Sequence, residues 1–215
     1  MGKRALIIGA SGLTGAFALQ YLLKEKAYDS VTVLGRKRMD LQHPKLSQVV
    51  TDFERFAVPE CDDVFCCLGT TMAKAGGEEA FRRVDFEIPM AVAQAARVAG
   101  AKQFLLVSSI GAAIDSRYYY LRVKAELEEA LGGMGFEGLK IFRPSLLMGA
   151  RAEIRFKEFV GQFAMALLGP LMFGRLKRYK GIQAKVVGWA MVRVAEKNEP
   201  GKMIYENESI GASGA

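Results

Sequence analysis

The sequence predicts an α/β fold of the doubly wound, Rossmann-like kind, with a parallel sheet of about seven strands and a small C-terminal cap. Three observations predict it. Residues 5–8 are four consecutive apolar residues that run into Gly9, as in a central parallel strand buried on both faces. Glycines then recur at three-residue spacing, and an apolar, helix-compatible stretch follows them. Further short apolar strands and helical stretches alternate along the chain.

The glycine turn after the first strand is the predicted phosphate-binding loop. Its glycines would permit a tight turn, a close approach of backbone to a pyrophosphate, and close packing of the next helix on the strand. The helix N-terminus offers unpaired N–H groups to phosphates, and two hydroxyl side chains could add donors. The predicted cofactor contacts in this loop are Gly9, Ser11, Gly12, Leu13, Thr14 and Gly15. The alternative is a purely structural strand-to-helix turn.

Basic residues follow the predicted second strand at residues 30–35 and favour NADP(H) over NAD(H). Arg36 lies 21 positions after Gly15 (36 − 15), near the spacing at which NAD sites place an acidic residue on the ribose. The guanidinium of Arg36 and the ammonium of Lys37 suit a 2′-phosphate better than a hydroxyl. The alternative is a solvated charge run.

The predicted third strand (residues 48–51) and fourth strand (residues 63–67) each end at candidate cofactor contacts. Asp52 is expected either to accept a hydrogen bond from the adenine amino group or to cap a helix. The glycine turn after the fourth strand is expected to pass close to the ribose or a phosphate. The predicted contacts here are Asp52, Phe53, Leu68, Gly69 and Thr70.

A tyrosine and a lysine on one predicted helix carry the candidate chemistry. A helix is predicted downstream of the fifth strand, residues 102–109, and within it Tyr120 and Lys124 are four residues apart and share a face. A nearby ammonium lowers the pKa of a phenol, so Tyr120 could exchange a proton with a carbonyl or alcohol oxygen during hydride transfer. Lys124 could also bond the nicotinamide ribose.

The last third of the chain contains a sixth strand at residues 139–143, a helix at 183–196 and a final strand at 202–205. Residues 151–180 mix charged residues with an apolar run that is too short to span a membrane. We expect a small lid over a substrate pocket or a homodimer surface there, with contact to a membrane surface as an alternative. Residues 211–215 are expected to form a flexible tail.

The amino-acid composition excludes several classes of function and favours others. The chain has 215 residues, 51% of them hydrophobic, which suits a single domain. The net charge of +7 favours anionic ligands, but no motif predicts nucleic-acid binding. His43 is the only histidine, which excludes a Ser-His-Asp site and a histidine-rich metal site, so no metal is expected. Three cysteines, interpreted as reduced, and no apparent signal peptide predict a cytoplasmic protein.

The motifs in this order resemble those of the short-chain dehydrogenase/reductase superfamily. The glycine turn, the Leu-Val-Ser-Ser sequence ending at Ser109 and the Tyr-x-x-x-Lys spacing carry the resemblance, and the glycine spacing is similar to that of its extended and atypical branches. More closely, residues 65–71, 83–85 and 120–124 resemble the family of the Tat-interacting, oxidoreductase-like protein. The likeness covers residues 3 to 150.

The resemblance implies a Rossmann fold, bound NADP(H) and a Ser–Tyr–Lys set, with Ser109 holding the substrate oxygen and Ser108 as an open alternative. It also implies that the turn at Pro144 faces the nicotinamide. The interval of only 11 positions between Ser109 and Tyr120 (120 − 109) departs from the family pattern. We therefore expect an NADP-dependent oxidoreductase acting on a small carbonyl or alcohol substrate, or alternatively an NADPH-binding regulatory module without turnover.

Overall fold

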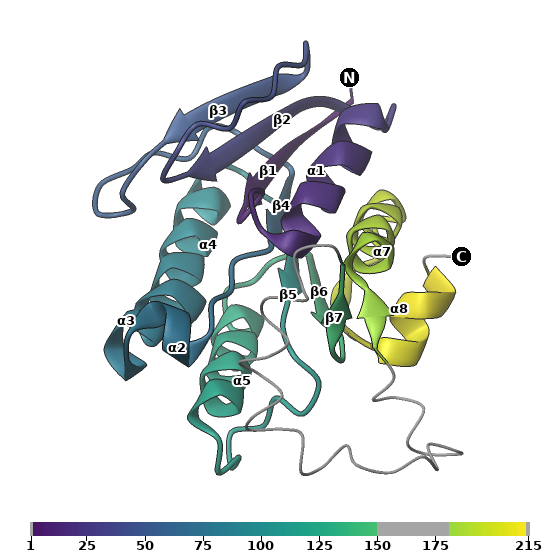
Figure 1. Cartoon of the computed structure of the whole chain (residues 1–215). Coiled ribbons are helices and arrows are strands. Elements are labelled where there is room, and N and C mark those ends of the chain that lie inside the picture. The colour runs from purple at the N-terminus through teal and green to yellow at the C-terminus, as the bar shows by residue number, and fades with distance from the viewer. Residues whose placement is uncertain (1, 150–180, 214–215) are drawn as a thin grey trace.

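The computed structural model describes residues 2–149 and 181–213 and contains a seven-stranded, fully parallel sheet. The spatial order is β3-β2-β1-β4-β5-β6-β9, and Figure 1 labels the strands from β3 to β6. The predicted α/β, doubly wound architecture is confirmed. The strands are β1 (Lys3–Ile8), β2 (Tyr28–Gly35), β3 (Leu46–Val50), β4 (Asp63–Cys66), β5 (Gln103–Val107), β6 (Gly138–Arg143) and β9 (Gly201–Glu206).

Helices cover both faces of the sheet, as Figure 1 shows: α1 (Leu13–Lys24) and α7 (Ala184–Glu196) lie on one face, α4 (Ile88–Val98) and α5 (Tyr119–Gly132) on the other. Side chains alternate along each strand. In β1, Ile7 therefore belongs to the core under α1 and α7, whereas its neighbour Ile8 belongs to the core under α4 and α5. This double burial explains the unbroken apolar run that predicts the strand.

Shorter elements complete the described chain. A π-helix, η1, joins α3 to α4, and Pro89 falls in the first turn of α4, where proline is tolerated. A second, two-stranded parallel sheet pairs β7 with β8. These elements are α2 (Met72–Ala75), α3 (Glu78–Arg82), η1 (Arg83–Glu87), β7 (Leu147–Met148), β8 (Ile182–Gln183) and α8 (Asn207–Ser213).

The flexible tail predicted for residues 211–215 is wrong for residues 211–213, which end helix α8. Contacts with the core and with the turn after β6 hold this helix in place. Ile210 is fully buried in the core under α7, and the Asn207 side chain accepts a hydrogen bond of 3.0 Å from the backbone N–H of Ser145. Packing thus overrides the small, turn-prone residues of this segment.

The sheet reverses its winding between β1 and β4. From β1 the chain proceeds outward through β2 and β3, then crosses back to β4 and proceeds outward the other way. In doubly wound folds this switch point opens a crevice at the carboxyl ends of the two strands, where ligands bind. Here the loops after β1 and β4 touch, because a Cβ placed on Gly9 would lie 2.5 Å from the carbonyl carbon of Cys67.

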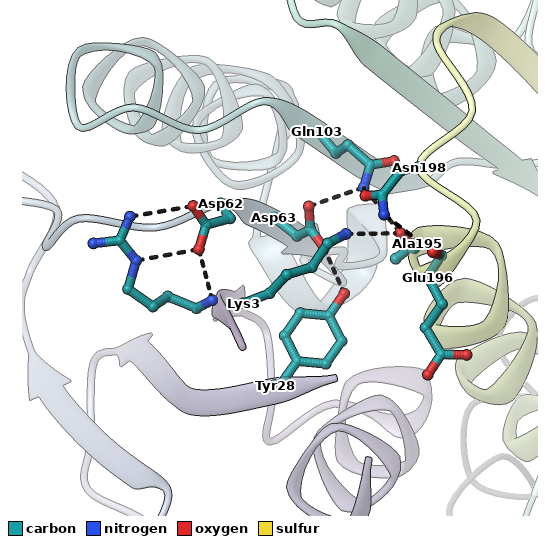
Figure 2. Close-up of polar contacts among 9 residues, drawn as sticks. Lys3, Tyr28, Asp62, Asp63, Gln103, Ala195, Glu196 and Asn198 are labelled. Carbon is teal, nitrogen blue, oxygen red and sulfur yellow. Dashed lines mark hydrogen bonds and ion pairs between the residues drawn. The ribbon is translucent and has the colours of Figure 1, made fainter. Parts of the chain in front are cut away.

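The amino ends of the strands are joined by a buried polar cluster centred on Asp63, which Figure 2 shows. Its carboxylate pairs with the Lys3 ammonium at 2.8 Å and accepts hydrogen bonds from the Tyr28 hydroxyl at 2.5 Å and the Gln103 amide at 2.9 Å. The Gln103 amide also donates to the carbonyl of Ala195 in α7 at 2.9 Å. The cluster ties β1, β2, β4, β5 and α7 together at the end of the sheet opposite the switch point.

The lid, dimer surface or membrane contact predicted at residues 151–180 lies outside the described residues. Within residues 2–149 and 181–213, no helix has the length and apolar character that a membrane crossing requires.

Candidate functional site

The glycine loop has the geometry that the motif requires at two of its glycines. Gly9 has a φ of +78°, a left-handed conformation that L-residues with side chains rarely adopt. A Cβ on Gly15 would lie 2.2 Å from the carbonyl oxygen of Gly9, so only glycine lets α1 begin this close to β1. Both positions were identified from the sequence, and here each has a measurable steric reason.

The N-terminus of α1 has unsatisfied donors. Gly12 is its N-cap residue and has no side chain to cap the first N–H groups. The Thr14 hydroxyl is buried and, in the described part of the chain, has no hydrogen-bond partner. Buried polar groups are normally satisfied, so an orphaned hydroxyl at an uncapped helix N-terminus fits a phosphate oxygen.

Arg36 and Lys37 lie in the loop directly after β2 and are exposed. Among residues 2–149 and 181–213, no carboxylate forms an ion pair with either side chain. Both cations are thus available to an anionic ligand beyond the end of β2.

Asp52 is exposed, and its carboxylate accepts a hydrogen bond of 2.9 Å from the backbone N–H of Glu54. No helix begins there in the described chain, so the predicted alternative of a helix cap is wrong: the side chain stabilises a turn instead. Phe53 has a φ of 68° and packs edge-on against Phe56, with 5.7 Å between ring centroids. The adenine contact of Asp52 stays a prediction.

The turn after β4 lies against a buried carboxylate that the sequence did not predict as a site residue. The backbone N–H of Thr70 donates a hydrogen bond of 2.9 Å to Asp85, which projects from the π-helix η1. A Cβ on Gly69 would lie 3.7 Å from Asp85 and 3.9 Å from the Lys124 ammonium. Leu68 packs into the core under α4 and α5.

Lys124 is buried and forms an ion pair of 2.7 Å with Asp85, whose side chain is fully buried. Burial alone would lower the pKa of the ammonium, but the attraction of Asp85 and of the nearby Tyr120 outweighs it, so the pKa of Lys124 is raised. The lysine is therefore a stable cation beside Gly69. In the sequence, Asp85 belongs to the 83–85 motif that carries the family resemblance, but this motif alone does not predict a role for its side chain.

Tyr120 lies on α5 one turn before Lys124, and its ring packs against the fully buried Phe81, with 5.5 Å between centroids and 49° between planes. Tyr119 packs on the same phenylalanine with a centroid distance of 6.2 Å. The structure thus keeps Tyr120 near Lys124, as the four-residue spacing predicts.

The two serines after β5 differ in their surroundings. The buried Ser108 hydroxyl donates a hydrogen bond to Glu128, whose carboxylate also accepts from Arg143 at 2.5 Å. Ser109 is less buried, and its hydroxyl donates a weak hydrogen bond of 3.3 Å to the carbonyl of Ile110. Ser108 therefore already has a charged partner, whereas the Ser109 hydroxyl does not have one in the described structure.

Pro144 follows β6, and its carbonyl oxygen accepts a hydrogen bond of 3.0 Å from the N–H of Ile110. The loop after β5 is thereby fixed to the turn after β6. A Cβ on Gly149 would lie 2.9 Å from Leu13 at the start of α1, so the segment after Pro144 returns to the glycine loop. Within the described chain no group of three or more His, Cys, Asp or Glu side chains could hold a metal ion.

Comparison with known proteins agrees with this geometry. Residues 9–136 match the family model described as NAD(P)H-binding. Protein HTATIP2 of Rattus norvegicus is 37% identical over 168 residues, covering 74% of this chain and 69% of that protein. Protein FMP52, mitochondrial, of Eremothecium gossypii is 34% identical over 214 residues, covering 96% and 95%. The chain belongs to the HTATIP2/FMP52 family. The resemblance stated from the sequence motifs is thereby confirmed, and the family is NAD(P)-binding and oxidoreductase-like.

Solved structures support the fold of this HTATIP2/FMP52 family member. A short chain dehydrogenase family protein from Francisella tularensis has a TM-score of 0.71 at 10% identity, covering 97% of this chain and 99% of that one. Human epimerase family protein SDR39U1 with NADPH has a TM-score of 0.61 at 17% identity, covering 94% and 73%. MoeE5 in complex with UDP-glucose and NAD has a TM-score of 0.69 at 14% identity, covering 94% and 74%. Such low identities establish the fold alone.

The cytoplasmic location predicted from the sequence is wrong, because fungal members of the HTATIP2/FMP52 family are named mitochondrial proteins. The prediction rested partly on reduced cysteines, and all three are indeed free, with Cys61 and Cys66 buried. Free thiols do not by themselves identify the compartment.

Proposed function

We propose that this protein is an NADP-dependent oxidoreductase that interconverts a small carbonyl compound and its alcohol. The observation that carries the proposal is the buried Lys124 ammonium, which lies beside the Gly69 turn and one helical turn from Tyr120. This turn follows β4, next to the loop after β1 where α1 begins with uncapped N–H groups. A dinucleotide held on α1 would thus bring its nicotinamide end towards the tyrosine–lysine pair.

Each residue has a defined task in this proposal. Bound NADP(H) supplies or accepts the hydride. In the reducing direction Tyr120 donates its hydroxyl proton to the carbonyl oxygen, and Lys124 stabilises the phenolate that remains. Lys124 also hydrogen-bonds the nicotinamide ribose. Ser109 donates a hydrogen bond to the substrate oxygen as negative charge develops on it.

The preference for NADP over NAD rests on Arg36 and Lys37. Both are exposed beyond the end of β2, and neither is paired with a carboxylate in the described chain. A guanidinium binds the oxygens of a 2′-phosphate in bidentate geometry and gains much less from a ribose hydroxyl.

The direct test is to measure NADPH oxidation by the purified protein with a panel of small aldehydes and ketones, beside Tyr120→Phe. Removing the hydroxyl should lower kcat by about 10²- to 10⁴-fold, the usual contribution of a positioned acid, with NADPH affinity retained. Tyr119→Phe is the matched control, because Tyr119 packs on the same Phe81 ring. The proposal gives the Tyr119 hydroxyl no part in the reaction, so this variant should keep full turnover. Tight NADPH binding without turnover on any substrate would instead favour a regulatory NADPH-binding module.

A further inference from the structure

Asp85 is a buried carboxylate at the centre of the candidate site. It lies on η1, a π-helical turn, and such turns frequently occur at functional sites. One of its oxygens is 2.7 Å from the Lys124 ammonium, and the other accepts the Thr70 N–H at 2.9 Å. One side chain thus holds both the lysine and the turn that follows β4.

The Asp85 carboxylate compensates the positive charge of the buried Lys124 ammonium. The groups that act on the ammonium are Asp85 from η1, Tyr120 from its own helix and Cys66 from β4. Burial raises the pKa of the Cys66 thiol to about 12, so it is neutral near pH 7. Asp85 is the one ion-pair partner of Lys124 in the described chain, and a buried ammonium without a partner loses its proton rather than remain charged.

We propose that Asp85 is a positioning residue that keeps Lys124 permanently cationic, so that Lys124 anchors the cofactor ribose and stabilises the Tyr120 phenolate but carries no protons itself. Proton exchange with the substrate then belongs to Tyr120 alone. The statement rests on the proposed function as far as the cofactor and Tyr120 are concerned, whereas the charge of Lys124 can be tested without either.

The first experiment measures NADPH affinity of Asp85→Asn between pH 7 and pH 10, by quenching of intrinsic fluorescence. The wild type should bind with nearly constant affinity over this range. The variant should lose at least tenfold in affinity as pH rises, because Lys124 now loses its proton several pH units earlier. Asp63→Asn is the matched control: it removes another buried, ion-paired carboxylate, at the opposite end of the sheet, and should follow the wild type. A variant profile parallel to the wild type would overturn the proposal.

The second experiment measures unfolding free energy against pH by urea denaturation and needs no cofactor. In Asp85→Asn the folded state binds fewer protons than the unfolded state once Lys124 is neutral, so its stability should rise from pH 7 to pH 10 relative to the wild type. Adding Lys124→Met should recover much of the loss at pH 7, because no buried charge is left unpaired. A pH-independent deficit, or no recovery in the double variant, would contradict the role of Asp85. Failure of the wild type to bind NADPH would refute the proposed function but not this result.

Discussion

Arg36 is the residue on which cofactor choice depends in the function proposed here. Its guanidinium is exposed beyond β2, and the described chain offers it no carboxylate. The positive charge of Arg36 is therefore not neutralised by an ion pair within the described chain. An exposed guanidinium has little effect on the free energy of unfolding, and it adds to the affinity for an anionic ligand when that ligand binds.

Replacing Arg36 by glutamate should lower NADPH affinity by about 10- to 100-fold, because a charge-assisted hydrogen bond is lost and a like charge faces the 2′-phosphate. NADH affinity should stay within a few-fold. Isothermal titration with both cofactors measures the two effects. Lys26→Glu makes the same charge change on an exposed residue beyond the C-terminal end of α1 and should leave both affinities unchanged. Equal losses for NADPH and NADH would argue against this role of Arg36.

At the scale of elements, the contact between α1 and α7 limits which residues fit on one face of the sheet. Gly188 lies in α7 where the two helices meet, and a Cβ there would be 2.8 Å from the backbone nitrogen of Ala18 and 3.1 Å from the Cβ of Phe17. Because backbone cannot move away as a flexible side chain can, the helices can approach this closely only at glycine.

Gly188→Ala should therefore destabilise the protein by about 1–3 kcal/mol through overpacking, in spite of the higher helix propensity of alanine. Gly132→Ala is the matched control at the last residue of α5. Its new methyl group would meet the flexible end of Lys202 at 3.5 Å, so it should be neutral or slightly stabilising. Urea unfolding of both variants measures the difference, and equal behaviour of the two would refute the packing argument.

At the scale of the whole molecule, the two ends of the sheet have different tasks. The carboxyl ends present the loops of the candidate site, and the amino ends are held by the Asp63 cluster (Figure 2). Four contacts around Asp63 and Gln103 join five elements, namely β1, β2, β4, β5 and α7. Stability and binding should therefore respond to different substitutions.

Asp63→Asn should lower the unfolding free energy by about 2 kcal/mol, because it weakens the bonds to Lys3 and Tyr28. The cost stays below that of a fully buried pair, since the Lys3 side chain is 23% exposed and can be rehydrated. NADPH affinity should not change. Chemical denaturation and cofactor titration of the same samples check both statements, and a tenfold loss of affinity would show that the two ends are coupled.

Alkaline pH should destabilise the fold as a whole. Burial raises the pKa of the Cys61 and Cys66 thiols to about 12, and burial together with Asp63 raises the pKa of Tyr28. These groups keep their protons in the folded state at pH values where the unfolded chain has lost them. The unfolding free energy should thus be greatest below about pH 9 and fall as pH rises towards 12. Constant stability from pH 8 to pH 11 would contradict this expectation.

Much of the architecture could be predicted from local sequence. The strand before Gly9, the glycine turn and the spacing of Tyr120 and Lys124 are short-range patterns, and the seven-stranded parallel sheet they predict is confirmed. The glycine positions could be predicted as well, because a positive φ or a close backbone contact restricts that one position to glycine.

Only the tertiary structure shows which buried charges meet. Asp85 and Lys124 are 39 positions apart in the chain (124 − 85). Ser108, directly after β5, meets Glu128 on α5, 20 positions further along. Packing against α7 likewise makes residues 211–213 helical. The sequence alone determined the chain order of the seven sheet strands and the glycine loop, because neighbouring residues encode them. The folded chain decided the partners of each buried charge, since burial makes pairing obligatory but local sequence does not say where the partner lies.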